Sequence, residues 1–238
     1  MEKILICVCD YRTPSGVLDS LKKEFEIIQL PPDTSLPAPV CGHSDLLIFR
    51  LEEYLITRNS YYHIAKHEID LICEKAGLDI ILSDAEAGAK YPYDCGLCAA
   101  VSGDKVICRK ASADGEIRRL AKSLGYDILN VPQGYSKCSC AILADGAVIT
   151  ADRGIAAVTL EKGIETLIIS EGNIDLPGYS YGFIGGATGL CGDALYFCGD
   201  LKTHPDSEAI EAFAEKHNTE CVSLGKERLY DVGSLIFI

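Results

Sequence analysis

Short apolar runs alternate with helical patterns along the chain, and residues 134–170 show the alternation most clearly. Two apolar segments are joined by Asp145-Gly146, and Asp-Gly between apolar runs favours a hairpin because glycine adopts positive φ without steric cost. Asp152 then favours a helix N-cap, and Gly163 favours the end of that helix. The predicted order is strand, strand, helix, strand, at residues 137–143, 147–150, 154–162 and 165–170.

The same order of elements recurs in further segments of the chain. The longest helical pattern covers residues 60–76, with Gly77 as its C-cap. Other helices are expected at residues 113–123 and from a capping Asp206 to about residue 215. Strands are expected at residues 46–49, 54–58, 79–83, 95–101, 105–108, 126–131, 195–198 and 220–224.

The two ends of the chain complement each other. Residues 3–9, 15–25 and 26–30 predict a strand, a helix and a strand, whereas residues 229–238 predict a strand with no helix. Together they would complete one more unit, and units that repeat at roughly 40–50 residues indicate a closed repeat array. Closure removes exposed sheet edges, so we expect residues 1–238 to form a single α/β domain.

Charge and composition narrow the classes of partner. The 238 residues carry a formal net charge of −13 with a pI near 4.8, which disfavours nucleic acids and anionic membranes as partners. No unbroken apolar segment approaches the roughly 18 residues of a membrane span, and the early Asp10 is unlike a signal peptide. We therefore expect a cytoplasmic protein with a small-molecule ligand; its oligomeric state stays open.

Twelve cysteines are an unusually large number for a chain of this length. Without an export signal, we expect reduced thiols rather than disulfides. Cys95 and Cys98 have CxxC spacing, and Cys138 and Cys140 form a similar pair with one residue between them. An alternative to free thiols is therefore a zinc site built from both pairs. Neither a second CxxC nor a histidine at ligand spacing accompanies them, and we expect no cofactor. Cysteines expected in the core as small apolar side chains are Cys7, Cys73, Cys108, Cys198 and Cys221.

Five phrases carry a resemblance to a known family. They are YPYD (91–94), GYSKCS (134–139), YGFIGGATG (181–189), GDLKTHPD (199–206) and LYDVGS (229–234). They resemble a bacterial family described as "GME fold", for which no activity is established, within the pentein or α/β-propeller superfamily. That superfamily contains guanidino-modifying enzymes and a non-catalytic ribosome anti-association factor. The resemblance implies a five-fold pseudo-symmetric α/β-propeller of ββαβ units, closed by the C-terminal strand joining the N-terminal unit.

The resemblance also implies a site around the central channel. Catalytic penteins place a cysteine nucleophile, a histidine and acidic residues there, and the nucleophile usually comes from the last unit. Residues 229–238 contain neither cysteine nor histidine, so either the site has moved to another unit or the chain is not catalytic. The stretches that would face the axis are residues 41–45, 94–98, 137–140, 185–193 and 231–234.

Those stretches supply the candidate site residues. We expect Cys138 as nucleophile, with Lys137 beside it lowering its pKa, and His43 as acid and base. The carboxylates expected to bind a cationic substrate are Asp45, Asp94 and Asp231. The alternatives are a buried strand residue for Cys138, a turn residue bonded to backbone for His43, and an ion pair with a channel carboxylate for Lys137.

Other polar and glycine-rich stretches have simpler interpretations. GGATG at residues 185–189 could cradle an anion, but close backbone packing explains its glycines better. His204 is expected near the rim, before the helix that Asp206 caps. His63, His67 and His217 are expected at the surface.

Two functions remain at this point. One is an amidinohydrolase- or deiminase-like enzyme, or a transferase, that uses a covalent cysteine adduct on a guanidino or amidino compound. The other is a non-catalytic pentein that binds a small ligand or a protein partner. A distance of about 4–6 Å between the reactive groups of Cys138 and His43 would favour the enzyme.

Overall fold

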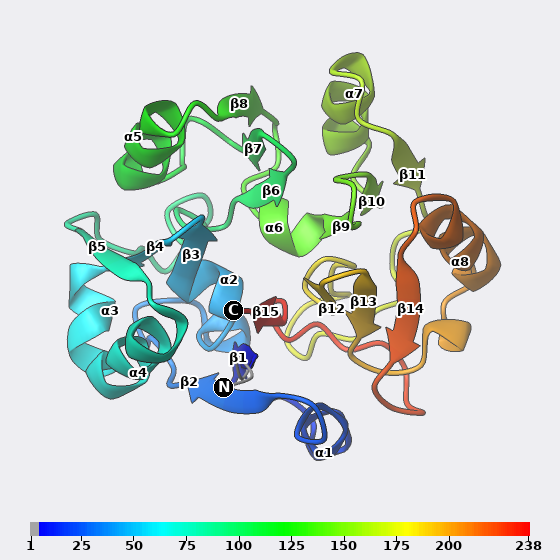
Figure 1. Ribbon diagram of the computed structural model, residues 1–238, viewed down its shortest axis with the longest axis horizontal. Helices are drawn as coiled ribbons and strands as arrows, with labels where there is room; N and C mark the ends of the chain where they lie inside the picture. Colours follow the sequence, from blue (N-terminus) through cyan, green and yellow to red (C-terminus); the bar gives the residue numbers. More distant parts are fainter. Residues whose placement is uncertain (1–4) are drawn as a thin grey trace.

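Five three-stranded sheets make up the core of the computed structural model, which describes residues 5–238 (Figure 1). In each sheet the middle strand pairs antiparallel with one neighbour and parallel with the other. The sheets, in order of their strands, are β15 (Ile236–Phe237), β1 (Ile6–Asp10) and β2 (Glu26–Leu30); β3 (Ile48–Leu51), β4 (Tyr54–Arg58) and β5 (Asp79–Ser83); β6 (Ala100–Ser102), β7 (Lys105–Cys108) and β8 (Asp127–Asn130); β9 (Ala141–Ile142), β10 (Val148–Thr150) and β11 (Thr166–Ile168); and β12 (Thr188–Cys191), β13 (Ala194–Phe197) and β14 (Glu220–Ser223).

Helices connect the parallel strands of each sheet and lie toward the outside of the view, whereas β6, β9, β12 and β15 lie toward its middle (Figure 1). The connecting helices are α1 (Ser15–Leu21), α3 (Asn59–Ile64), α4 (Lys66–Ala76), α5 (Gly115–Ser123), α7 (Arg153–Glu161) and α8 (Ser207–Lys216). Four single-turn elements complete the chain: η1 (Ala38–Val40), α2 (Ser44–Leu47), α6 (Ser136–Ser139) and η2 (Leu201–Thr203). None of the helices in the described part of the chain has the length and apolarity that a membrane span requires.

The C-terminal strand pairs with the N-terminal one, as predicted. β15 runs antiparallel to β1, with Phe237 opposite Cys7 and Ile236 opposite Val8. Ile6 and Ile238 exchange backbone hydrogen bonds of 2.9 Å in both directions. Part of the strand predicted at residues 3–9 lies outside the described residues.

Five hydrophobic clusters fill the spaces between the sheets, and each combines side chains of two sheets. Clusters of this kind stabilise repeat proteins because no single small sheet buries enough apolar surface by itself. One pair of buried residues represents each cluster: Val8 with Ile48, Phe49 with Val106, Ile107 with Val148, Ile149 with Leu195, and Tyr196 with Cys7.

Asp152 caps α7 as predicted, because its Oδ1 accepts a hydrogen bond of 2.8 Å from the backbone N–H of Ile155. Replacing Asp152 by alanine should lower the free energy of unfolding by about 1 kcal/mol, since an orphan N–H at the helix start loses its acceptor. Urea denaturation measures this loss. Asp19→Ala, at an exposed position of α1, is the control and should change stability by less than about 0.5 kcal/mol. Equal stability of the two variants would contradict the capping role.

Three predicted strands are wrong over their first residues. Residues 44–47 and 136–139 form the helical turns α2 and α6, and residues 95–99 contain no strand. Local hydrogen bonds, such as that of 2.9 Å from Ser139 N to Tyr135 O, replace pairing with a neighbouring strand, and Asp45 N also donates to the distant Gly233 O at 3.0 Å. The helix predicted at 60–76 is also interrupted, at Ala65, where φ is −108° and ψ is 27°.

Candidate functional site

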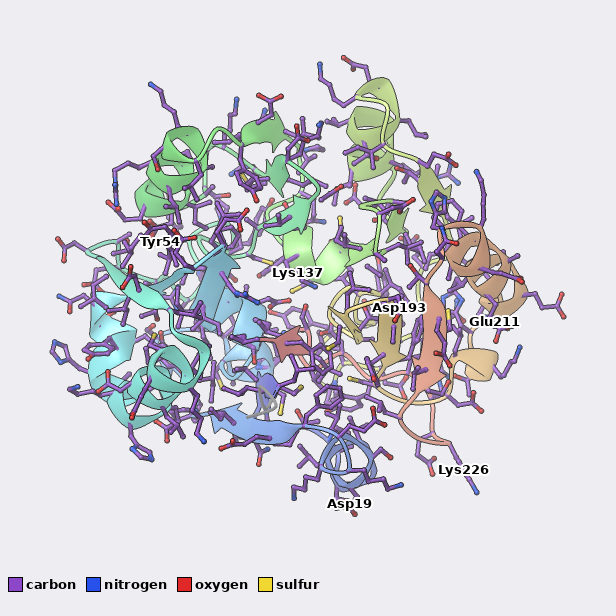
Figure 2. The ribbon with its side chains drawn as sticks, in the orientation of Figure 1. Asp19, Tyr54, Lys137, Asp193, Glu211 and Lys226 are labelled. Carbon is purple, nitrogen blue, oxygen red and sulfur yellow. The ribbon has the colours of Figure 1, made fainter. Side chains whose placement is uncertain are left out.

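The two helical turns α2 and α6 hold the reactive side chains. His43 precedes α2, Asp45 lies within it, and Cys138 lies within α6. Figure 2 shows Lys137, the neighbour of Cys138, near the middle of the molecule, whereas Asp19 and Lys226 lie at its periphery. Neither turn belongs to a strand ladder, and side chains of both turns line cavities of the molecule.

His43, Asp45 and Cys138 form a buried cluster. One donor atom from each lies within 4.8 Å of the others, and the three residues are 2%, 2% and 3% exposed. The Cys138 thiol donates a hydrogen bond of 3.0 Å to Asp45 Oδ2. The separation of Cys138 from His43 therefore falls within the range of about 4–6 Å that favours an enzyme.

The thiol of Cys138 does not have the expected low pKa. Burial raises its pKa well above that of an ordinary thiol, and a contact with Cys98, whose Sγ lies 3.6 Å away, and the negative charge of Asp45 raise it further. Lys137 was expected to give this thiol a low pKa, whereas the pKa is raised. Its Nζ instead donates to Ser234 Oγ at 3.2 Å.

A cavity of about 100 Å³ adjoins the thiol. His43, Cys138 and Asp231 supply its polar lining, and aromatic rings form much of its wall. The rings are those of Tyr135, Tyr179, Tyr181 and Phe183. We call this space the aromatic cavity. Aromatic faces with a carboxylate suit a small organic cation.

Asp231 lies beneath this wall and is 1% exposed. Its Oδ2 accepts from Phe183 N at 2.8 Å and its Oδ1 from Gly233 N at 2.9 Å, while His43 Nδ1 lies 3.8 Å from Oδ1. Burial raises the pKa of Asp231, and nearby His43 opposes the shift. A bound cation would favour the ionised carboxylate.

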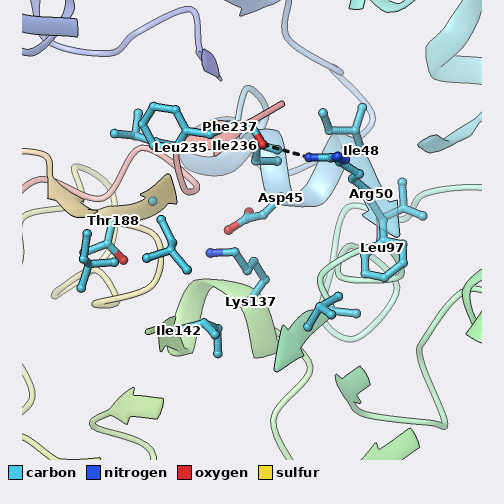
Figure 3. A pocket seen from close by; sticks show the side chains of 16 residues that line it. Asp45, Ile48, Arg50, Leu97, Lys137, Ile142, Thr188, Leu235, Ile236 and Phe237 are labelled. Atoms are coloured by element: carbon cyan, nitrogen blue, oxygen red, sulfur yellow. Dashed lines mark hydrogen bonds between the residues drawn. The ribbon is translucent and has the colours of Figure 1, made fainter. Parts of the chain in front are cut away.

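A second, larger cavity of about 210 Å³ is lined by Asp45, which is absent from the lining of the aromatic cavity (Figure 3). Residues of β3, β6, β9, β12 and β15 line it, so every sheet contributes its first strand. Asp45 and Lys137 point toward one another there (Figure 3). Ser234 connects them, because its hydroxyl donates to Asp45 Oδ2 at 2.7 Å and accepts from Lys137. We call this space the strand cavity.

Asp94 lies in neither cavity. It is 1% exposed, and its Oδ2 accepts a hydrogen bond of 2.5 Å from the Tyr135 hydroxyl. Burial and this contact raise the pKa of Tyr135. Asp94 therefore positions an aromatic wall residue, whereas the sequence prediction has it binding the substrate directly.

Sequence reasoning missed Ser234 and the aromatic wall. Ser234 is fully buried with a left-handed φ of 68°, which is strained for a residue other than glycine. The sequence signal that could have identified Ser234 as a site residue was its position in the stretch 231–234, which was expected to face the axis. The rings come from separate segments, and nothing in the local pattern of Tyr135 or Phe183 indicates that they meet.

Several simpler interpretations have clear outcomes. A cluster of Cys95, Cys98, Cys138 and Cys140 is not formed, since the one set of metal-ligand geometry within residues 5–238 is His43, Asp45 and Cys138. Close backbone packing of GGATG is confirmed, because Gly186 N donates to Cys138 O at 2.8 Å. His63 and His67 are exposed, as expected. His217 is buried rather than at the surface, and His204 is also buried.

Solved structures with a similar fold are guanidino-modifying enzymes of the pentein superfamily. A DDAH from Pseudomonas aeruginosa in complex with citrulline aligns over 94% of this chain and 92% of its own, with a TM-score of 0.56 and 10% identity. An agmatine deiminase from C. jejuni aligns over 94% and 87%, with a TM-score of 0.54 and 12% identity. The N-terminal domain of a cyanobacterial arginine dihydrolase, bound to product, aligns over 92% and 90%, with a TM-score of 0.57 and 10% identity. At these identities the likeness establishes the fold alone.

Comparison at the level of sequence gives a family without an assigned activity. No curated protein matches the chain. Residues 8–236 match the family of unknown function DUF6873. Since the match spans nearly the whole chain, the protein belongs to the DUF6873 family, on a pentein fold.

Proposed function

We propose that this protein is a hydrolase or transferase that binds a guanidino or amidino group in the aromatic cavity and attacks it with Cys138. The observation that carries the proposal is the shared lining of that cavity by Cys138, His43 and Asp231. Nucleophile, proton carrier and anionic ligand for a cation then face one small space. The cavity of about 100 Å³ suits a planar group of guanidinium size.

The arrangement of the sheets supports the same proposal. The five hydrophobic clusters link each sheet to the next, and the cluster that contains Tyr196 and Cys7 links the last sheet to the first. We infer a five-bladed propeller whose axis passes through the strand cavity, because the first strand of every sheet lines that cavity. The fold shared with a DDAH, an agmatine deiminase and an arginine dihydrolase favours guanidino chemistry for it.

Under this proposal each residue has a task. The Cys138 proton passes to Asp45, with which the thiol is hydrogen-bonded, and the thiolate forms a carbon–sulfur bond to the amidine carbon as the C=N electrons move to nitrogen. His43 protonates the departing amine, and Asp231 balances the remaining positive charge. In a hydrolase, His43 then takes a proton from water, the oxygen bonds to the same carbon, and the thiolate leaves and recovers its proton.

A second function is favoured by one observation, the raised pKa of Cys138. A thiol that stays protonated at neutral pH is a poor nucleophile. Under the non-catalytic alternative the same cavity would hold a cationic ligand without attacking it. The absence of cysteine and histidine from residues 229–238 also fits this alternative.

Thiol labelling across pH separates the two functions. We expect 2-chloroacetamidine, a cation, to alkylate Cys138 near pH 7, because its charge beside Asp231 offsets the burial that holds the thiol protonated. Neutral iodoacetamide should modify Cys138 only at higher pH, since the raised pKa then governs the reaction. Peptide mass spectrometry identifies the modified residue, and a panel of guanidino compounds follows. Equal, slow labelling of the half-buried Cys73, Cys191 and Cys221 by both reagents would refute the enzyme and leave the binding protein.

A further inference from the structure

We propose that His43, Asp45 and Cys138 form a zinc site, with Cys98 as the fourth donor. The donor atoms of the first three lie within 4.8 Å of one another, and all three residues are buried. A thiolate, an imidazole and a carboxylate are ligands that Zn²⁺ accepts together in a tetrahedral site. The inference does not rest on the proposed enzyme, because a non-catalytic protein would hold the ion equally well.

Unsatisfied polar atoms are the second observation that indicates a cation here. His43 Nδ1 and Asp45 Oδ1 are buried and have no hydrogen-bond partner. Such atoms each cost free energy in a protein interior unless a ligand or ion contacts them. Two carboxylates, of Asp45 and Asp231, lie in this region, and Lys137 bonds to Ser234 rather than to either. A divalent cation would compensate both the charge and the missing contacts.

Cys98 is at the right distance from Cys138 to share an ion. With metal–sulfur bonds of about 2.3 Å and tetrahedral angles, two ligating sulfurs lie about 3.8 Å apart. The two Sγ atoms lie 3.6 Å apart. Cys98 is outside the tighter three-residue set, so its side chain would shift toward His43 and Asp45 when the ion binds.

The surroundings complete the site. Asp231 Oδ1 lies 3.8 Å from His43 Nδ1, so this second carboxylate would lie close to an ion held by His43 and add to its electrostatic stabilisation. The strand cavity reaches Asp45 and the aromatic cavity reaches Cys138, so an ion has access from both sides. Metal binding must displace the thiol protons, so affinity should rise roughly 10-fold per pH unit for each proton released.

Cobalt substitution tests the site without any assay of activity. Titration of the whole chain with Co²⁺, in the presence of a reductant that does not bind metals, should give one tightly bound ion and sulfur-to-cobalt absorption from two thiolates. Cys98→Ser should halve that absorption. Cys138→Ser and His43→Ala should weaken Zn²⁺ binding, measured by competition with a chelator, by at least about 100-fold.

Cys95→Ser is the matched control, because Cys95 belongs to the same CxxC but its thiol donates to Pro92 O. It should bind cobalt like the wild type. Circular dichroism of each variant separates lost binding from lost folding. Absorption that persists in Cys138→Ser, or that is unchanged in Cys98→Ser, would overturn the four-donor site. Amidine labelling of Cys138 without cobalt binding would overturn the metal site and leave the proposed enzyme standing.

Discussion

Replacing Gly185 by alanine is expected to unfold the protein or to lower its free energy of unfolding by at least about 3 kcal/mol. An added Cβ would lie 2.2 Å from the carbonyl oxygen of Lys137, 2.4 Å from that of Cys140 and 2.7 Å from that of Cys138. All three are backbone atoms, so no side-chain rotation relieves the overlap. The helical turn α6 would have to move as a unit, and the Cys138 thiol with it.

Soluble expression and urea denaturation measure this effect. Gly16→Ala in α1 is the matched control, since a Cβ there meets nothing within 4 Å. Alanine has the higher helix propensity, so this control should stabilise the protein by roughly 0.5–1 kcal/mol. A Gly185→Ala protein as stable as the wild type would show that the contact between GGATG and α6 is looser than described.

The second large effect is expected from Asp231→Asn. We expect the preference of Cys138 for 2-chloroacetamidine over iodoacetamide to fall by about 100-fold or more. The buried carboxylate is the charge that faces a cation in the aromatic cavity, and losing one partner of a buried charge pair costs about 2–5 kcal/mol. The ratio of the two labelling rates in one sample corrects for any change in stability.

Asp175→Asn is the control for this experiment. Asp175 also lies next to the C-terminal segment, in a bridge with Tyr230, but it is half exposed and pairs with Arg228 instead of lining the cavity. Asp175→Asn should leave the ratio of the two labelling rates unchanged. If Asp231→Asn left the ratio of the two labelling rates unchanged, the aromatic cavity would not bind a cation through Asp231. That result would contradict the proposed function.

Local sequence signals were sufficient to predict many of the strands and helix ends. The predicted strands at residues 26–30, 54–58, 79–83 and 105–108 have the bounds of β2, β4, β5 and β7. Gly77 and Gly163 end their helices at positive φ, of 69° and 76°. These elements carry turn or cap residues whose chemistry acts within a few positions of the chain.

The secondary-structure predictions fail where contacts between segments far apart in sequence determine the backbone conformation. Residues 44–47 (SDLL) and 136–139 (SKCS) lead into short apolar runs, and such a run suits a buried strand or a buried helical turn equally. Hydrogen bonds from Asp45 N to Gly233 O and from Gly186 N to Cys138 O settle the matter, and both join residues far apart in sequence. No window of local sequence contains them.

The predictions for the candidate site also differ in their outcome. Cys138, His43 and Asp231 come from three of the stretches expected near the axis, and all three line the aromatic cavity. Lys137 and Cys138 line different cavities, because adjacent side chains of a helical turn point in different directions: Cys138 lines the aromatic cavity and Lys137 the strand cavity. Adjacency in sequence is therefore a poor guide to which cation affects a thiol.

The pairing of β15 with β1 has a consequence for biosynthesis. Phe237 is the partner of Cys7, so β1 cannot complete its sheet until residues up to Phe237 have left the ribosome. At about 5–20 residues per second, β1 waits roughly 10–50 s with one edge open. An unpaired apolar strand held open for that time is a site of aggregation, and the yield of folded protein should therefore depend on how well nascent chains are shielded in the host.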